Sequence, residues 1–300
     1  MPATKSVLIV GGSGFIGTHL AQRLRDDYKV FATYCKHPIQ IPGVTCIPLT
    51  ADNRNWVKRI VYMARPDVVV FAAGNNDVRW CEDNGREAER VHSAGAAMVA
   101  TVADILQPKF IYLSNCYAFD GKRGNYHEAD IILPHTELGK VKISGENFIK
   151  GRSLNYVFLR SSPVIGRGNG INLSILDKIR IKLSKGEKID LPADELHSFA
   201  PVDGLLDLIE RVIETGIRNK TLHYGGLTKI TYYDLGVMIA EKFGFDPTLI
   251  TMARDIHGQT NENMFDYSMN STHTVETLKI KPFFLEECLD LIEKNLIPGL

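Results

Sequence analysis

The sequence predicts an α/β fold in which helices cover both faces of a parallel β-sheet, followed by a smaller C-terminal lobe. Through the first half of the chain, short runs rich in β-branched residues alternate with longer helical patterns. The short runs are nearly continuous in apolar residues, as expected for strands buried on both faces. Strands that alternate with helices form parallel sheets. After about Ile165 the alternation becomes looser, which marks the change to the second lobe.

Each expected strand is a run of Val, Ile, Leu, Phe and similar residues bounded by polar or turn-forming ones. The strands are Ser6–Val10, Val30–Thr33, Val44–Pro48, Val68–Ala72, Phe110–Ser114 and Tyr156–Arg160. Asp52 is expected to cap a helix over residues 53–63, and Asp203 a helix over residues 204–214, because a carboxylate accepts bonds from free N–H groups there. Further helices are expected at Leu173–Leu183, Tyr232–Phe243 and Phe284–Asn295.

These elements divide the chain into two lobes. Residues 1–165 with about 199–225 would form the sheet domain, and about 166–198 with 226–300 the smaller lobe, which binds substrate. In open α/β sheets the ligand lies outside the carboxyl ends of the strands. The cleft between the lobes is therefore the expected ligand site.

The composition excludes several classes of protein. The 300 residues carry 35 basic and 35 acidic side chains, so no overall field attracts nucleic acid or an anionic membrane. No run of about eighteen apolar residues occurs and the first apolar run is short, so we expect a cytoplasmic protein. The 5 cysteines include no C-x-x-C pair and the 9 histidines are scattered, which favours reduced thiols and no metal site.

A glycine-rich turn follows the first expected strand and reads Gly11-Gly12-Ser13-Gly14-Phe15-Ile16-Gly17, before a helical pattern from His19. Glycines at these positions let the backbone approach a pyrophosphate, and the helix N-terminus offers free N–H groups to it. The order strand, turn, helix is typical of a Rossmann dinucleotide site. The residues expected to bind the cofactor here are Gly11, Ser13, Gly14, Phe15, Ile16 and Gly17.

The end of the second expected strand indicates which dinucleotide binds. Sites that prefer NAD place an Asp or Glu there for the ribose 2'-hydroxyl. Here the stretch reads Thr33-Tyr34-Cys35-Lys36-His37, without a carboxylate. Because Lys36 would attract a 2'-phosphate, we predict NADP(H), with NAD(H) as the alternative. Lys36 in an ordinary solvated turn is the other interpretation.

Longer motifs begin at the fifth expected strand, which continues into Ser114-Asn115-Cys116-Tyr117-Ala118-Phe119-Asp120-Gly121. Gly139-Lys140-Val141-Lys142 and Leu159-Arg160-Ser161-Ser162-Pro163-Val164-Ile165-Gly166 follow. The chain resembles the extended short-chain dehydrogenases along essentially its whole length, in the dTDP-4-dehydrorhamnose reductase branch. That branch also includes the regulatory beta subunit of methionine adenosyltransferase.

The resemblance implies a Tyr-x-x-x-Lys pair, with a Ser or Thr at the end of the fifth strand. In this sequence the lysine is Lys142, but Leu138 stands at the tyrosine position and Asn115 at the Ser/Thr position. None of the 11 tyrosines is followed by lysine four residues later. Leucine cannot exchange a proton, so the usual general acid is missing, which costs on the order of 10²–10⁴ in rate. The Asn115 amide could still polarise a carbonyl.

Other residues take roles through the same resemblance. Lys142 would hold the nicotinamide ribose. Independently of the resemblance, the basic charge of Arg167 makes it a candidate contact for a substrate diphosphate. The proton donors that could replace the tyrosine are Glu137, His135, His92 and Tyr117. Further residues expected beside the cofactor are Ala72, Ala73, Ser114 and Val164.

Three functions stay open on the sequence alone. The first is an NADP-dependent oxidoreductase acting on a nucleotide-linked keto sugar, with altered proton transfer. The second is a non-catalytic, cofactor-bound regulatory or scaffold protein that works through a protein partner. The third is a nucleotide-sugar epimerase or dehydratase. A homodimer is expected in addition.

Overall fold

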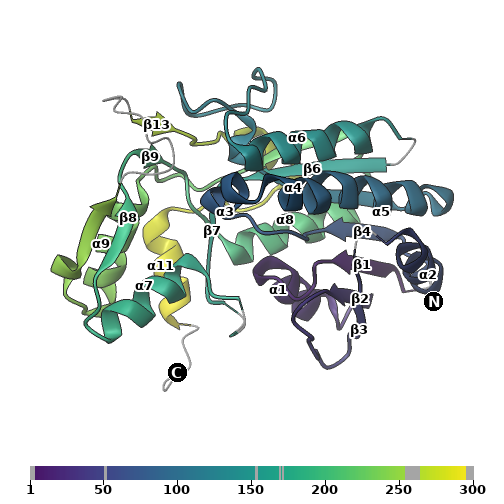
Figure 1. Ribbon diagram of the computed structural model, residues 1–300, viewed down its shortest axis with the longest axis horizontal. Helices are drawn as coiled ribbons and strands as arrows, with labels where there is room; N and C mark the ends of the chain where they lie inside the picture. Colours follow the sequence, from purple (N-terminus) through teal and green to yellow (C-terminus); the bar gives the residue numbers. More distant parts are fainter. Residues whose placement is uncertain are drawn as a thin grey trace.

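In a computed structural model, which describes residues 4–50, 53–152, 155–168, 170, 172–253 and 264–294, the core is a seven-stranded parallel sheet. Its order is β11-β6-β5-β4-β1-β2-β3, so the chain reverses direction across the sheet between β1 and β4 (Figure 1). This is the doubly wound Rossmann arrangement that the sequence predicts. The strands are β1 (Ser6–Val10), β2 (Lys29–Tyr34), β3 (Thr45–Pro48), β4 (Val68–Phe71), β5 (Lys109–Asn115), β6 (Asn155–Ser161) and β11 (Lys220–Tyr224).

All the expected strands are present, with ends that differ from the prediction by one residue. The sequence did not predict β11, which pairs with β6. Its alternation of Lys220, Thr221 and His223 with apolar residues lacks the continuous apolar run that marks the other strands. His223 is nevertheless completely buried.

Helices cover both faces of the sheet (Figure 1). On one face, apolar side chains of α1 (Phe15–Leu24) and α8 (Val202–Glu214) pack against the strands. On the other, α2 (Arg54–Ala64), α5 (Ala96–Ala103) and α6 (Glu137–Lys150) do so. Shorter elements complete this region: α3 (Val78–Asp83), α4 (Gly85–Ala88), a π-helix over Glu89–Gly95, α10 (Thr272–Leu278), and 3-10 turns at Asp104–Leu106 and Cys116–Ala118.

Two helix starts differ from the sequence prediction. The α2 helix is capped by Asn53, whose side chain accepts a hydrogen bond from the Trp56 amide, while Asp52 lies outside the described residues. The prediction for Asp203 was wrong, because α8 begins at Val202 and Asp203 lies in its first turn. An acidic residue still interacts favourably with the helix dipole there.

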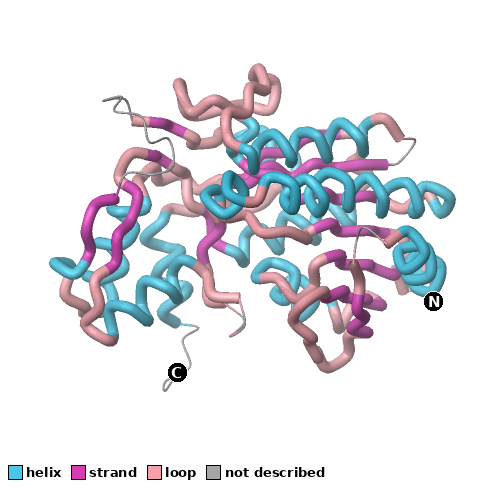
Figure 2. Tube along the Cα trace, in the orientation of Figure 1, coloured by secondary structure: helices cyan, strands magenta, loops and turns pink. Residues whose placement is uncertain are grey.

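A second group of elements lies beside the seven-stranded sheet and its helices (Figure 2). These elements pack around their own apolar cluster, which includes Leu176, Leu235 and Ile239. The expected helices occur here, and α7 starts at Ile175 because Ser174 and Asp177 form a capping box before it. The elements are α7 (Ile175–Ser184), β8 (Ile189–Pro192), α9 (Tyr232–Phe243), a 3-10 turn at Pro247–Leu249, β12 (Ile250–Ala253) and α11 (Leu285–Lys294). Short ladders pair β7 (Val164–Ile165) with β10 (Ala200–Pro201) and β9 (Glu195–Leu196) with β13 (Phe265–Asp266).

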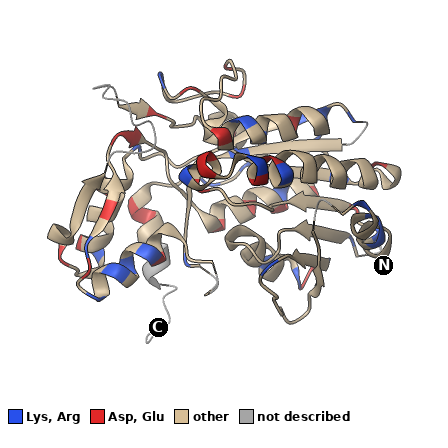
Figure 3. Ribbon diagram, in the orientation of Figure 1, with Lys and Arg blue, Asp and Glu red and all other residues tan. Residues whose placement is uncertain are grey.

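Charged residues of both signs are spread over the helices in the view of Figure 3. No helix in the described part of the chain is long and apolar enough to cross a membrane.

Candidate functional site

The turn between β1 and α1 is packed so tightly that only glycine fits at several of its positions. Gly11 has a φ of +93°, and a Cβ added to it would lie 2.6 Å from the Ala73 backbone. A Cβ on Gly17 would lie 2.2 Å from the Gly11 carbonyl oxygen. The turn therefore lies directly against Ala72 and Ala73, which follow β4.

Gly14 is less crowded than Gly11 and Gly17. It is the N-cap of α1 in an extended conformation, without a side-chain cap, and a Cβ there would meet only the Gly11 oxygen at 3.3 Å. Phe15 and Ile16 begin the helix and are half-buried. The backbone N–H groups of this first turn can thus bind an anion, so the cradle fits a pyrophosphate.

The segment after β7 lies over this turn. The His19 ring donates from Nε2 to the Arg167 carbonyl oxygen at 2.7 Å, and the Asn172 amide donates to the Ser13 carbonyl oxygen at 2.6 Å. Arg167 is half-buried beside α1. The sequence did not suggest His19 or Asn172, since neither belongs to a motif and both bonds join segments far apart in the chain.

Lys36 lies exposed in the turn after β2. It is close enough to Glu87 to help lower the pKa of that carboxyl, although a hydrogen bond from Arg90 is the main cause. In the preceding strand the Thr33 hydroxyl accepts a hydrogen bond from the Gly11 amide at 3.1 Å. The end of β2 is thereby fixed to the glycine turn.

Two buried polar atoms without hydrogen-bond partners belong to the last two residues of β5, and a third belongs to His92 on the π-helix. Within the described residues, Ser114 Oγ, Asn115 Nδ2 and His92 Nδ1 are buried and unpartnered. Asn115 is held in place because its Oδ1 accepts from the Tyr117 amide at 3.1 Å. Buried polar groups normally find partners, so the unpartnered atoms at the end of β5 indicate a position for a polar ligand.

His92 lies in the π-helix, a distortion that often occurs at functional sites. Its Nε2 donates to the Asn75 carbonyl oxygen at 2.8 Å, which leaves Nδ1 as a bare lone pair. Burial, followed by the charge of Lys142, holds the pKa of His92 well below its usual value. The ring is therefore neutral near pH 7.

Lys142 is buried, with only 2% of its surface exposed. Its Nζ donates to the Leu113 carbonyl oxygen at 2.8 Å and lies 5.3 Å from the centre of the Tyr112 ring. Burial lowers the pKa of Lys142 to about 7, although Cys81 and Glu146 partly oppose this shift.

Leu138 lies one turn before Lys142 on the buried face of α6. Its side chain belongs to an apolar cluster, with 1% of its surface exposed. Other members of this cluster are Val78, Cys81, Phe119, Val141 and Tyr267.

The other expected proton donors are engaged elsewhere. Glu137 forms an ion pair with Lys140 at 2.6 Å on the outer surface of α6, and His135 lies in an exposed loop. The Tyr117 hydroxyl donates to Glu195 Oε2 at 3.1 Å, and His197 lies at the same distance from that oxygen.

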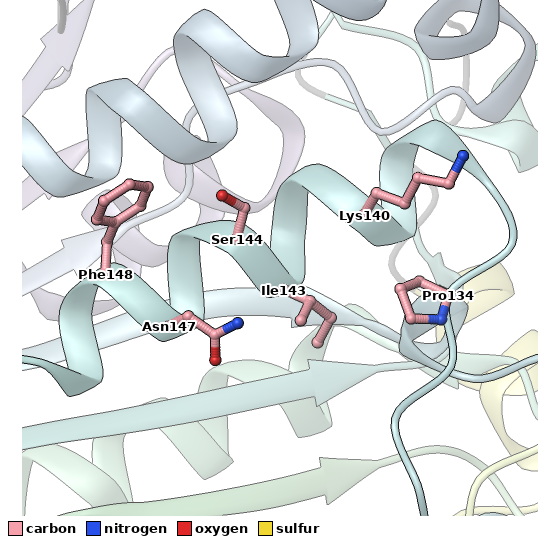
Figure 4. A pocket seen from close by; sticks show the side chains of 6 residues that line it. All are labelled: Pro134, Lys140, Ile143, Ser144, Asn147 and Phe148. Atoms are coloured by element: carbon pink, nitrogen blue, oxygen red, sulfur yellow. The ribbon is translucent and has the colours of Figure 1, made fainter.

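A hollow of about 540 Å³ lies on the outside of α6 (Figure 4). Lys140, Ser144 and Asn147 line it (Figure 4). Lys142 lies on the opposite face of the same helix, so this hollow is separate from the site at the strand ends.

Comparisons with known proteins agree with this architecture. Residues 5–281 match the family described as RmlD substrate binding domain. The probable low-salt glycan biosynthesis reductase Agl14 of Haloferax volcanii is 27% identical, over 81% of each chain. The spore coat polysaccharide biosynthesis protein SpsK of Bacillus subtilis is 25% identical over 94% of this chain and 95% of its own. A dTDP-4-dehydrorhamnose reductase of Burkholderia thailandensis is 24% identical over 84% and 80%.

Solved structures share the fold. The dTDP-4-dehydrorhamnose reductase of Bacillus anthracis in complex with NADP has a TM-score of 0.82 and 20% identity, covering 98% of this chain and 100% of its own. The Bordetella bronchiseptica enzyme WbmH in complex with NAD+ has a TM-score of 0.80 and 20% identity, covering 95% and 96%. The family match over residues 5–281, together with the dTDP-4-dehydrorhamnose reductase relative, confirms the family resemblance expected from the sequence.

Proposed function

The chain belongs to the RmlD substrate binding domain family, and from this premise we propose that it is a nicotinamide-dependent reductase of a nucleotide-linked 4-keto sugar. The proposal rests on two features that lie at the carboxyl edge of the sheet. One is the open N-terminus of α1 at Gly14, and the other is the group of unpartnered polar atoms at Ser114 and Asn115. Relatives named as reductases support the same reaction class.

The glycine turn would hold the cofactor's pyrophosphate on the backbone amides of Phe15 and Ile16 in the first turn of α1, and Lys142 would lie at the ribose. When bound, the reduced nicotinamide supplies a hydride. We propose NADP(H) as the preferred cofactor because the exposed Lys36 follows β2, where sites that prefer NAD carry an Asp or Glu.

The substrate carbonyl would accept a hydrogen bond from Asn115 Nδ2. This amide is buried, lacks a partner in the described residues and is fixed through Oδ1. A donor held in advance at a carbonyl oxygen stabilises the negative charge that develops there. Arg167, beside the glycine turn, is the proposed contact for the diphosphate of the sugar nucleotide.

A second candidate function is a non-catalytic protein that keeps the cofactor and binds a protein partner. Leu138 favours this alternative, because its apolar side chain is buried at the position where the family resemblance implies a tyrosine. No proton can come from that position.

Single-turnover oxidation of bound NADPH separates the two candidates. The protein would be loaded with NADPH and mixed with a panel of nucleotide-linked 4-keto sugars, while cofactor fluorescence is followed. If the protein is a reductase, cofactor fluorescence should fall with one class of sugar. An Asn115→Leu variant that still binds NADPH should show no such fall. Bound NADPH that no sugar consumes would reject the reductase in favour of the partner-binding protein.

A further inference from the structure

We infer that Lys142 itself donates the proton to the carbonyl oxygen of the substrate, in place of a tyrosine. This inference rests on the proposed reductase function. It assigns the proton to a side chain that lies within the site, on the face of α6 that covers the carboxyl end of β5.

The position of Lys142 supports this role. One of its three N–H groups is used by the Leu113 carbonyl oxygen. The next two residues of the strand, Ser114 and Asn115, carry the unpartnered buried atoms. Side chains alternate along a strand, so Ser114 lies on the same face of β5 as Tyr112, over whose ring the ammonium lies. A ligand oxygen that bonds to Ser114 Oγ would therefore lie on the lysine's side of the strand end.

Other acidic protons near the site are less suitable. The Tyr117 hydroxyl donates to Glu195, so its proton points toward that carboxylate. The Cys81 thiol is buried and donates to the Asn75 carbonyl oxygen, and burial raises its pKa to about 11. His92 is neutral, and its N–H group is also bonded to Asn75.

The surroundings of Lys142 make its proton labile near neutral pH. Titratable groups face it from every element packed around it, namely Cys81 on α3, His92 on the π-helix, Tyr112 on β5 and Glu146 on α6. The Glu146 carboxylate is itself held by a bidentate pair with Arg160, at 3.0 and 2.6 Å. Glu146 is therefore committed to Arg160 and gives the Lys142 ammonium only weak support. Burial consequently lowers the pKa of Lys142 to about 7. A general acid works best when its pKa lies close to the working pH.

The proton transfer conserves atoms and charge. The hydride enters at the carbonyl carbon, and the π electron pair moves to the oxygen. An N–H bond of Lys142 breaks and an O–H bond forms at that oxygen, which leaves a neutral amine. The amine then takes a proton from solvent, so one carbonyl, one hydride and one proton give one alcohol.

Chemical rescue tests this step directly. A Lys142→Ala variant should lose on the order of 10²–10⁴ in the single-turnover rate. Added primary amines should restore part of that rate, with a dependence on the amine pKa. Lys140→Ala is the matched control, because Lys140 lies on the outer face of the same helix and should keep the normal rate. Rescue that is absent or independent of amine pKa would overturn the inference while the reductase function stands.

A titration of the apoprotein provides a readout that does not depend on activity. With ¹³C at the lysine Cε positions, one NMR signal should titrate near pH 7 and disappear in a Lys142→Arg variant. A Lys142 signal that titrates near the ordinary pKa of about 10.4 would overturn the inference. If the unaltered protein oxidises no NADPH with any sugar, the proposed function and the inference fall together.

Discussion

Lys142 and Leu138 are the two residues that most directly test the proposed reductase function. They share the buried face of α6, one helical turn apart, and they differ in the one property that matters for reduction. Lys142 can give up a proton, and Leu138 cannot. Substitutions at these two positions therefore test the chemistry directly.

Replacing Leu138 by tyrosine should add a second proton donor beside Lys142. We expect a rise of about 10-fold or more in the single-turnover rate, because general acids contribute on the order of 10²–10⁴ when well placed. Leu138→Phe is the control, since it adds the same ring without the hydroxyl. Equal rates in the two variants would show that the hydroxyl does not reach the substrate.

The lowered pKa of Lys142 predicts how stability depends on pH. Between about 7 and the ordinary value of 10.5, the unfolded chain binds this proton and the folded chain does not, so stability rises with pH in that window. Below pH 7 both states hold the proton and the penalty of burying the charge is complete. A Lys142→Met apoprotein should thus be more stable than the unaltered protein at pH 6, and the difference should shrink above pH 7. Denaturant unfolding at several pH values checks this, and parallel curves would contradict it.

Substitutions in the glycine turn separate its role in cofactor binding from its role in packing. Gly14→Ala places Cβ 3.3 Å from the Gly11 oxygen, which crowds the turn only slightly, so the melting temperature should fall less than in Gly17→Ala while the Kd for NADPH rises. Gly17→Ala instead places Cβ 2.2 Å from the Gly11 oxygen and should lower the melting temperature by several degrees. Thermal melts and NADPH titrations distinguish the two effects. Equal loss of stability in both variants would contradict this account of the turn.

Lys36, in the turn after β2, tests the cofactor preference. Lys36→Asp should weaken NADPH binding by about 10-fold relative to NADH, since about 1.4 kcal/mol of attraction to the 2'-phosphate is lost. Lys185→Asp in the second lobe makes the same change of charge and is the control. If the ratio of the two Kd values stays constant, Lys36 does not contact the phosphate.

The expected strands and the glycine turn follow from local patterns, and the structure confirms them. Periodicity and glycine spacing act over a few residues, so the sequence contains them directly. The strand β11 escaped prediction because its buried polar residue, His223, is held by a distant partner: its ring Nδ1 donates to the Tyr126 carbonyl oxygen at 3.0 Å. The bonds from His19 and Asn172 across the glycine turn likewise depend on the complete fold.

For the molecule as a whole, the sheet brings together residues from every part of the chain at its carboxyl edge. The turn after β1, the ends of β4 and β5, the buried face of α6 and the segment after β7 all contribute to the candidate site. The sequence placed each of them on a strand end or helix, but it could not show that Lys142 is buried or that Ser114, Asn115 and His92 have unpartnered atoms. Those properties arise only when α6 and the π-helix pack on the sheet.

The most direct test of the central claim is the single-turnover oxidation of bound NADPH by nucleotide-linked 4-keto sugars, measured from pH 5 to pH 9. A reductase in which Lys142 donates the proton predicts fluorescence loss whose rate falls as the pH rises through about 7. The same fall should be absent from the residual rate of Lys142→Ala. Bound NADPH that stays unconsumed at every pH and with every sugar would contradict the claim.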